Sequence, residues 1–209
     1  MKMKTGFPMN GKRKKEKKMK VYINPGHDLD YDSGAVHTDE NGDVDLRECD
    51  VAARIGALAK QYLEAAGCQV RMLQSDNLCD DSEYSDRPVA VCDDANEWGA
   101  DVFVSIHCNA CAGHDARGTE TWCFAEGTDG ALLAEKIQAQ MVGSIATTDR
   151  GVKVMPGLMV LKHTDMPACL VETAFIDNNS DADLLRTGYD DFARAIARGV
   201  TDYQQTKMG

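Results

Sequence analysis

The stretch from residue 102 to residue 110, VFVSIHCNA, constrains the fold of this chain more than any other. Four of its first five residues are apolar and three are β-branched, which is typical of a strand buried on both faces of a sheet. We expect the strand to end at His107, where the sequence becomes polar. Because open α/β folds bind ligands at the carboxyl edge of the sheet, His107 and Asn109 would then lie at a ligand-binding edge.

Two further apolar strands are expected to end at a polar side chain in the same way. Residues 21–24 come shortly before His27, and residues 168–171 come directly before Glu172. Helices are expected between the strands, the clearest at 46–66, where apolar residues recur every three or four positions. This alternation predicts a three-layer α/β fold, with a largely parallel or mixed sheet and helices on both faces.

Shorter patterns predict the remaining elements. Helices are expected at 86–98, 132–145 and 189–203, strands at 69–74 and 118–124, extended segments at 152–154 and 158–161, and loops at 30–43 and 177–185. The last of these loops is expected to contain a short helical turn. We find no internal repeat among these elements, so we expect them to form one domain.

The composition indicates one folded domain behind a basic N-terminal segment. Hydrophobic residues make up 43% of the 209 residues and charged residues 27%, which is typical of a soluble globular protein. Residues 1–20 hold nine Lys or Arg against one Glu, and we expect them to be a disordered tail. An arm that seeks the cell wall, a membrane or nucleic acid is the alternative for this tail. The domain itself is expected to span residues 21–205.

The charge of the expected domain argues against one class of partner. The whole chain has a net charge of -11, and because the tail is basic, the remaining residues carry -19. A surface of this sign repels phosphate backbones, so we expect no nucleic-acid binding by the folded body. No run approaches the roughly 18 apolar residues that a membrane-spanning helix needs, so we expect no transmembrane segment.

Eight cysteines occur in the chain, a count that on its own would suit a set of disulfides. The N-terminus lacks the apolar core of a secretory signal, so we expect synthesis in the cytoplasm without a signal peptide. Reduced thiols are therefore expected, and several lie at apolar positions where free Cys behaves as a small hydrophobe. Cys108 and Cys111 form a CxxC beside His107, for which unpaired thiols are preferred over a zinc or redox pair.

Glu48 has two interpretations at the start of the predicted helix 46–66. In the first, Asp45 is the N-cap and Asp45-x-x-Glu48 is a capping box, in which the carboxylate only completes the helix start. In the second, Glu48 points inward, because it lies at helical spacing before the apolar stripe of the helix. An inward carboxylate needs a cationic partner, and a metal ion would serve if His27 and His107 lie nearby.

Parallel strands would bring four residues of suitable chemistry to one edge of the sheet. His27, His107 and Glu172 come at the ends of predicted strands, and the helix start at Glu48 would lie on the same side. Two histidines and one carboxylate around an open position are typical of a catalytic zinc site, because three ligands leave a fourth place for water. A second carboxylate would then serve as the general base. The residues alone do not decide which glutamate takes which part.

Six runs of the sequence, from about residue 21 to residue 203, carry a family resemblance. They read PGHD, SDRPVAVCDDANEWGADVFVSIHCNA, GTETWCF, RGVKV, VLKHTDMPACLVETAFIDN and SDADLL. They resemble the zinc-dependent N-acetylmuramoyl-L-alanine amidases of bacterial autolysins and phage endolysins. The resemblance implies that His27, Glu48 and His107 bind one Zn2+ per chain and that Glu172 is the catalytic acid/base. It also implies hydrolysis of the amide between N-acetylmuramic acid and L-alanine in peptidoglycan, at the cell wall.

Two other functions remain open at this point. A zinc peptidase that cuts within the stem peptide would need the same ligands and base, since this chemistry serves any amide. A non-catalytic peptidoglycan-binding module would keep the fold without the reaction. Asp28 and Leu29 follow His27 where many relatives have two glycines, which leaves the shape of that loop open. The sequence does not indicate an oligomeric state.

Three further residues are candidates for contact with the substrate. Asn109 would bind substrate or orient a ligand, with a simple role in the turn as the alternative. Glu120 would line the groove or be a solvated strand residue. His163 precedes the last strand, and a surface histidine is its preferred interpretation. His37 and His114 lie in polar segments, and we assign them no role.

Overall fold

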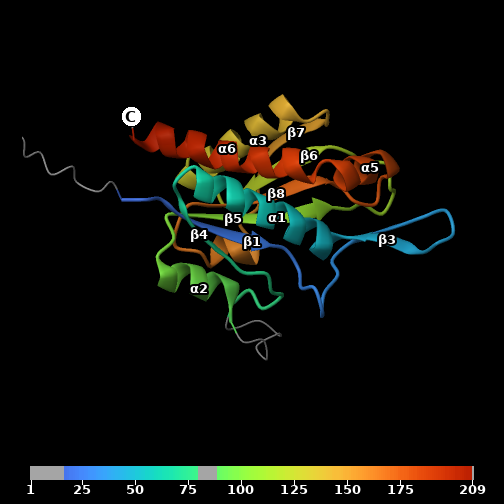
Figure 1. Cartoon of the computed structure of the whole chain (residues 1–209), viewed down its shortest axis with the longest axis horizontal. Coiled ribbons are helices and arrows are strands. Elements are labelled where there is room, and N and C mark those ends of the chain that lie inside the picture. Colours follow the sequence, from blue (N-terminus) through green and yellow to red (C-terminus); the bar gives the residue numbers. More distant parts are fainter. Residues whose placement is uncertain (1–16, 80–88, 209) are drawn as a thin grey trace, which may run out of the picture.

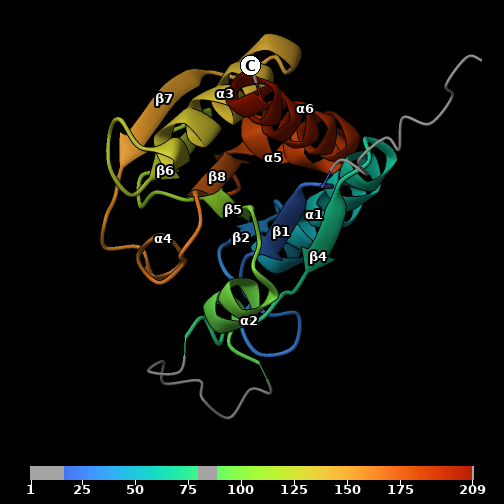
Figure 2. The same cartoon turned by 90° about the vertical axis from the view of Figure 1, so that its left-hand side faces the viewer.

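A computed structural model describes residues 17–79 and 89–208. In this part of the chain a six-stranded sheet lies between two layers of helices, as Figure 1 and Figure 2 show. The expected α/β fold, with helices on both faces of a mixed sheet, is thereby confirmed. The expected tail falls mostly in residues 1–16, which lie outside the described residues. None of the helices in the described ranges has both the length and the apolar character that crossing a bilayer demands.

The order of the strands puts the most buried ones in the middle of the sheet. The strands are β1 (Lys20–Pro25), β4 (Gln69–Met72), β5 (Val102–Asn109), β6 (Thr119–Cys123), β7 (Asp149–Val154) and β8 (Ala168–Phe175), and they lie in the order β4-β1-β5-β8-β6-β7. The first four in that order are parallel, so their carboxyl ends share one edge. β6 runs antiparallel to β8, and β7 is parallel to β6.

Long helices cover one face of the sheet and short helices the other (Figure 2). The larger core lies under α1 (Glu48–Ala65), α3 (Asp129–Ser144) and α6 (Tyr189–Met208), and the smaller core under α2 (Val91–Trp98) and α4 (Met159–Lys162). Val102 and Val104 of β5 face the larger core. Phe103 faces the smaller one, where its ring stacks on Tyr22 with centroids 5.5 Å apart. The apolar run of β5 is therefore explained by burial on both faces.

The register of β5, β8 and β6 sets three polar side chains in one row. His107 pairs with Glu172 across β5 and β8, and Glu172 pairs with Glu120 across β8 and β6. The predictions that β5 ends at His107 and that β8 ends just before Glu172 are wrong. β5 continues to Asn109, with a bulge after His107, and β8 continues to Phe175. The polar side chains consequently stand on paired strands, where the hydrogen-bond ladder holds them, rather than on loops.

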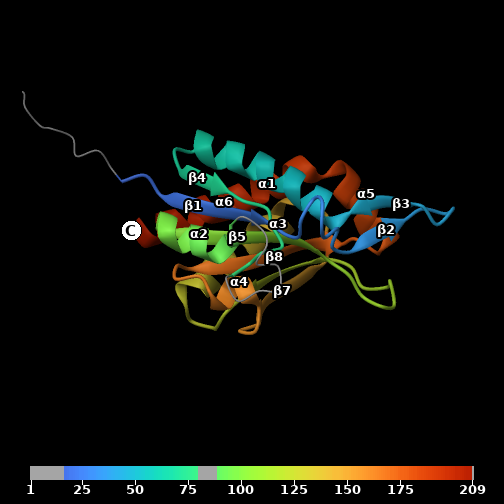
Figure 3. The same cartoon turned by 90° about the horizontal axis from the view of Figure 1, so that it is seen from below.

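A hairpin replaces much of the expected loop at 30–43 and projects beyond the end of the sheet (Figure 3). It consists of β2 (Val36–Thr38) and β3 (Val44–Arg47). In its turn the Oδ1 of Asp39 accepts hydrogen bonds from two main-chain N–H groups. Its strands are short and mostly polar, so they lack the alternation of apolar residues by which strands are recognised.

Three other segments differ from their expected form. Residues 158–161, expected to be extended, form most of the helical turn α4. The helix expected at 86–98 begins at Val91, and the first residues of that range lie outside the described part of the chain. The loop expected at 177–185 is largely the helix α5 (Asn179–Thr187).

The contact between α6 and α3 generates a prediction about packing. At Gly199 of α6 an added Cβ would lie 2.5 Å from the Cα of Ile137. Gly199→Ala should lower the free energy of unfolding by about 1–3 kcal/mol, because a main-chain atom cannot give way as a side chain would. Gly143→Ala places its Cβ more than 4 Å from every described neighbour, so it should leave this free energy unchanged or raise it by up to about 1 kcal/mol.

Urea unfolding followed by circular dichroism compares the two variants with the parent. If Gly199→Ala were as stable as Gly143→Ala, the close packing of α6 on α3 would be contradicted.

Candidate metal centre

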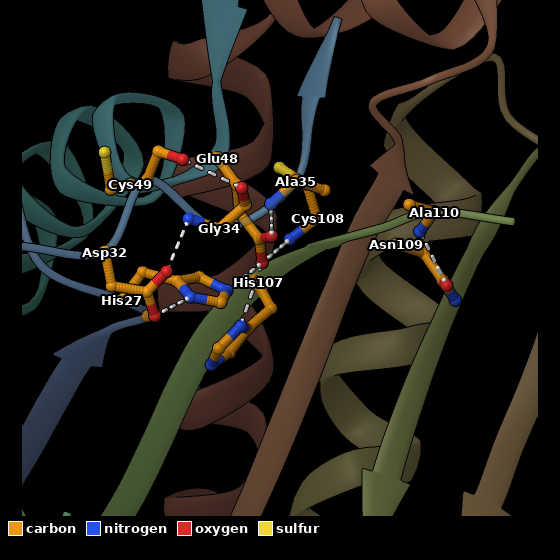
Figure 4. Close-up of polar contacts among 12 residues, drawn as sticks. His27, Asp32, Gly34, Ala35, Glu48, Cys49, His107, Cys108, Asn109 and Ala110 are labelled. Atoms are coloured by element: carbon orange, nitrogen blue, oxygen red, sulfur yellow. Dashed lines mark hydrogen bonds and ion pairs between the residues drawn. The ribbon is translucent and has the colours of Figure 1, made fainter. Parts of the chain in front are cut away.

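Three side chains from separate parts of the chain converge at the carboxyl edge of the sheet (Figure 4). His27 lies just after β1, Glu48 is the first residue of α1, and His107 lies in β5. The Oε1 of Glu48 is 3.0 Å from Nε2 of His27 and 2.9 Å from Nδ1 of His107. One nitrogen or oxygen atom from each residue lies within 4.8 Å of the others, so the three could hold one metal ion between them.

The main chain holds the Glu48 carboxylate from two sides. Its Oε2 accepts a hydrogen bond from the N–H of Ala35 at 2.9 Å, and its Oε1 accepts one from the N–H of Cys108 at 3.0 Å. Only 3% of the residue is exposed. These charge-assisted bonds fix the position of the carboxylate independently of the two histidines.

The capping box expected at the start of α1 does not form, and Glu48 points inward. The helix begins two residues later than expected, because β3 runs up to it, and Asp45 lies in that strand. The first N–H groups of α1 bond to main-chain oxygens of the loop 33–35. Asp45 instead binds the ring of His37 at 2.6 Å, so it is not available to cap the helix.

His27 reaches the group through an uncommon backbone conformation. Its φ of 64° lies in the left-handed region, which costs a non-glycine residue about 1–2 kcal/mol. Oδ2 of Asp32 lies 2.7 Å from Nδ1 of His27, which leaves Nε2 directed at Glu48. The loop that follows His27 is closed by two main-chain hydrogen bonds between Asp28 and Asp32, at 2.9 Å and 3.2 Å. This closure gives the loop a defined shape without the two glycines of many relatives.

Burial and charge act in opposite directions on two members of the group. Burial by itself raises the pKa of Glu48, but the hydrogen bonds from His107 and His27 outweigh it and lower the pKa to about 2. Burial lowers the pKa of His27, whereas Glu48 and then Asp32 raise it to about 9. Without a bound cation the Glu48 carboxylate is therefore ionised, and both ring nitrogens of His27 are protonated. A metal ion would displace the proton on the nitrogen that it binds.

Glu172 stands on β8 beside His107, and its environment differs from that of Glu48. Its buried Oε2 has no hydrogen-bond partner among the described residues. Burial, followed by the negative charges of Glu48 and Glu120, raises the pKa of Glu172 to about 8. A buried polar atom without a partner is rare in folded proteins and points to a functional reason. A carboxyl group of this kind can accept and return a proton near neutral pH.

Glu120 lies opposite Glu172 on β6, and only 2% of it is exposed. Its Oε1 accepts a hydrogen bond from Nδ2 of Asn109 at 2.9 Å, and its Oε2 accepts from Nε of Arg150 at 2.6 Å and Nζ of Lys153 at 2.5 Å. Burial raises the pKa of Glu120, but the two cations outweigh it and hold the pKa below its usual value. Sequence reasoning did not identify Arg150 or Lys153, whose only signal was the run RGVKV.

Two other histidines lie away from this group. His163 lies between α4 and β8, on the amino-terminal side of β8, where its main-chain oxygen accepts a hydrogen bond from Nδ2 of Asn96. The structure therefore does not bring His163 to the metal-binding group. His37 is buried in β2 rather than in a loop, and its ring bonds to Asp45 and to Asn179 of α5. This contact ties the hairpin to α5.

The cysteines do not form a metal site. All eight lie in the described part of the chain, and none of them forms a disulfide there. The CxxC pair diverges, because Sγ of Cys108 lies 3.4 Å from Oγ1 of Thr173 whereas Sγ of Cys111 faces Asp115 at 3.8 Å. Within the described ranges, the two histidines and Glu48 form the one group of three or more metal-binding side chains that converges.

The fold and this group define a class of protein. It is an α/β protein whose sheet edge carries two histidines and one carboxylate that could hold a metal ion, with a second carboxylate on the next strand. The family model described as N-acetylmuramoyl-L-alanine amidase matches residues 21–202. The chain therefore belongs to the N-acetylmuramoyl-L-alanine amidase family, and the resemblance noted in the sequence is confirmed.

Two relatives and one solved structure show how far the similarity extends. The N-acetylmuramoyl-L-alanine amidase LytC of Bacillus subtilis (strain 168) is 36% identical over 187 residues, which cover 88% of this chain and 35% of LytC. The uncharacterized protein YqiI of the same organism is 38% identical over 189 residues, which cover 88% of this chain and 84% of YqiI. The N-acetylmuramoyl-L-alanine amidase AmiC2 of Nostoc punctiforme has a TM-score of 0.75 at 30% identity, covering 90% of this chain and 97% of that one. The chain thus spans about a third of the length of LytC.

The space at Gly34 generates a test of the metal-binding group. Gly34 has a φ of +64°, and a Cβ there would lie 2.5 Å from the ring of His27 and 2.6 Å from Oε2 of Glu48. Gly34→Ala should displace both side chains and weaken the affinity for a divalent metal by about 10- to 100-fold. The measurement is a competition titration with a metal indicator.

Gly42→Ala is the matched control. Gly42 also has a left-handed backbone, with a φ of +85°, but a Cβ there meets no described atom within 4 Å. Both variants therefore carry a similar backbone cost, and only Gly34→Ala disturbs the group. Equal metal affinity of the two variants would contradict this description of the site.

Proposed function

We propose that this chain is a zinc-dependent amidase that hydrolyses the amide between N-acetylmuramic acid and L-alanine in peptidoglycan. One observation carries the proposal, namely that His27, Glu48 and His107 converge beside Glu172, a carboxyl with an unpartnered buried oxygen. Membership in the N-acetylmuramoyl-L-alanine amidase family supports the same reaction. An enzyme with this substrate acts at the cell wall.

The chemistry of the donor set fits zinc. Histidine nitrogens and carboxylate oxygens bind zinc at about 2.0–2.2 Å, so two ligand atoms on a tetrahedral ion are about 3.3 Å apart. The Oε1 of Glu48 is 3.0 Å and 2.9 Å from the two ring nitrogens, and all three donor atoms lie within 4.8 Å of one another, so the side chains must spread apart around Oε1 or draw together across the two rings to hold the ion. Asp32 on the other nitrogen of His27 is the outer partner typical of zinc-binding histidines. Bound zinc would supply Lewis acidity toward the substrate carbonyl and toward water.

The chain's own residues then have separate tasks. Glu172 takes a proton from the attacking water and returns it to the nitrogen of L-alanine as the C–N bond breaks. Its Oε2, which has no partner among the described residues, is the atom on which that proton is held. A nearby cation would lower the raised pKa of Glu172 and favour the ionised form that acts first, as a base. Asp32 and the main chain at Ala35 keep His27 and Glu48 oriented.

Replacement of the proposed acid/base should separate metal binding from catalysis. Glu172→Gln keeps the shape of the side chain but cannot take up the proton, so cleavage of muropeptides should fall by about 100- to 10,000-fold. Zinc content, measured by elemental analysis, should stay at the parent level. Glu135→Gln, on the exposed side of α3, is the control and should retain parent activity. Near-parent activity of Glu172→Gln would contradict the acid/base role.

The position of the cut identifies the reaction. Mass spectrometry of digested wall fragments should show peptides with a free N-terminal L-alanine. Products cut within the stem peptide would contradict the amidase reaction and favour a peptidase. Binding to wall fragments without any release of peptide would favour a non-catalytic module.

Removal of the metal should abolish activity reversibly. Dialysis against a chelator should stop cleavage, and added zinc should restore it. His107→Ala should lose most of its bound zinc, because two protein ligands remain where three held the ion. His114→Ala, which changes an exposed histidine paired with Asp177, should keep its zinc. Full zinc occupancy in His107→Ala would contradict its role as a ligand.

A further inference from the structure

Arg150 and Lys153 of β7 form a cationic pair that no step of the proposed reaction uses. Both side chains reach to the Oε2 of Glu120 on β6, at 2.6 Å and 2.5 Å. Glu120 lies directly opposite Glu172 in the pairing of β6 with β8. The pair therefore lies beside the proposed catalytic carboxyl, on the side away from the metal-binding group.

The pair is held in position while part of it faces solvent. The side chains of Arg150 and Lys153 are 33% and 34% exposed, whereas that of Glu120 is 2% exposed. The guanidinium carbon of Arg150 lies 4.8 Å from the centroid of the Phe175 ring, and Nζ of Lys153 lies 5.4 Å from that of Trp122. Only Nε of Arg150 bonds to Glu120, and its two Nη groups have no hydrogen-bond partner among the described residues. This free edge suits a carboxylate, which a guanidinium binds through two parallel hydrogen bonds.

The local charge differs in sign from that of the chain. Two cations on one carboxylate leave an excess of one positive charge, in a protein with a net charge of -11. Three carboxyl groups, those of Asp32, Glu48 and Glu172, lie along the same edge of the sheet. An anionic group of the substrate would be attracted to the cationic pair, and partial burial strengthens that attraction.

We propose that Arg150 and Lys153 form a subsite for a carboxylate on the second residue of the stem peptide, the residue that follows L-alanine. This subsite rests on the proposed function, because it binds the peptide that the amidase reaction releases. The Nη edge of Arg150 and the ammonium of Lys153 bind the carboxylate, and Glu120 positions both. A D-glutamate joined through its γ-carboxyl has a free α-carboxylate at this position unless that group is amidated.

The spacing of the strands agrees with a carboxylate on this residue of the peptide. Neighbouring strands are about 4.8 Å apart, so His107 on β5 and Glu120 on β6, with β8 between them, are separated by about 10 Å. An extended peptide advances about 3.5 Å per residue, so the carboxylate of the second residue lies about 7 Å from the cleaved bond. A hydrogen bond of about 3 Å then brings the carboxylate level with Glu120, whose Oε2 both Arg150 and Lys153 contact. L-alanine itself offers no free carboxylate within the stem.

Two muramoyl tripeptides test the proposal, because they differ only in whether the α-carboxyl of the second residue is free or amidated. The parent should cleave the free form with a kcat/KM about tenfold above that of the amidated form. Arg150→Gln and Lys153→Gln should each bring this ratio toward one. Lys207→Gln, which removes a surface cation paired with Asp129 on α3, should keep the parent ratio. The ratio compares two substrates on one variant, so it does not depend on the total activity of that variant.

Calorimetric titration of the two released tripeptides supplies a readout that needs no catalysis. The parent should bind the peptide with the free α-carboxylate about tenfold more tightly, and Arg150→Gln should bind the two equally. If Arg150→Gln fails to fold by circular dichroism, Lys153→Gln carries the same comparison. A ratio of one in the parent would overturn the subsite. A preference for the free α-carboxylate that persists in both Arg150→Gln and Lys153→Gln would also overturn it. A parent that cleaves neither substrate would overturn the proposed function, and the titration would still decide the subsite.

Discussion

The shared carboxylate of Glu48 is the interaction on which the rest of the site depends. It is almost fully buried, and a buried carboxylate without partners would cost several kcal/mol. His27, His107 and two main-chain N–H groups offset that cost, and they come from separate segments of the chain. The hairpin of β2 and β3 leads directly into α1, where Glu48 is the first residue. The loop before the hairpin supplies the N–H of Ala35, and the left-handed backbone of His27 directs its ring toward the same carboxylate. The irregular features of this region therefore share a physical cause.

The paired strands β5, β8 and β6 hold further polar side chains in a row beside that carboxylate. Because β5 and β8 remain paired beyond the site, His107 and Glu172 stand on rigid backbone, which is what a site needs to keep its geometry. The same row continues to Glu120 on β6 and, through its ion pairs, to Arg150 on β7. A slip of one residue in this register would turn a whole strand to the other face of the sheet. The two apolar cores fix the register of the strands. They therefore also keep His107, Glu172 and Glu120 side by side.

The sequence predicts the parts of this arrangement that depend on local patterns. Apolar runs located the buried strands, and polar residues at their ends located His27, His107 and Glu172 near one edge. Spacing could not decide between a capping box and an inward Glu48, because both put the carboxylate in the first turn of the helix. The decision comes from β3, a polar strand without an apolar pattern, which runs up to the helix start. Arg150 was not recognisable because its importance arises from strand pairing with β6, which no local pattern encodes.

Anomalous diffraction at the zinc absorption edge, from crystals of the zinc-loaded protein, tests the central claim most directly. The expected result is one strong peak at about 2.0–2.2 Å from a ring nitrogen of His27, a ring nitrogen of His107 and a carboxylate oxygen of Glu48, with Glu172 adjacent and not a ligand. A peak among the cysteines, or a peak from which any of these three side chains is turned away, would contradict it.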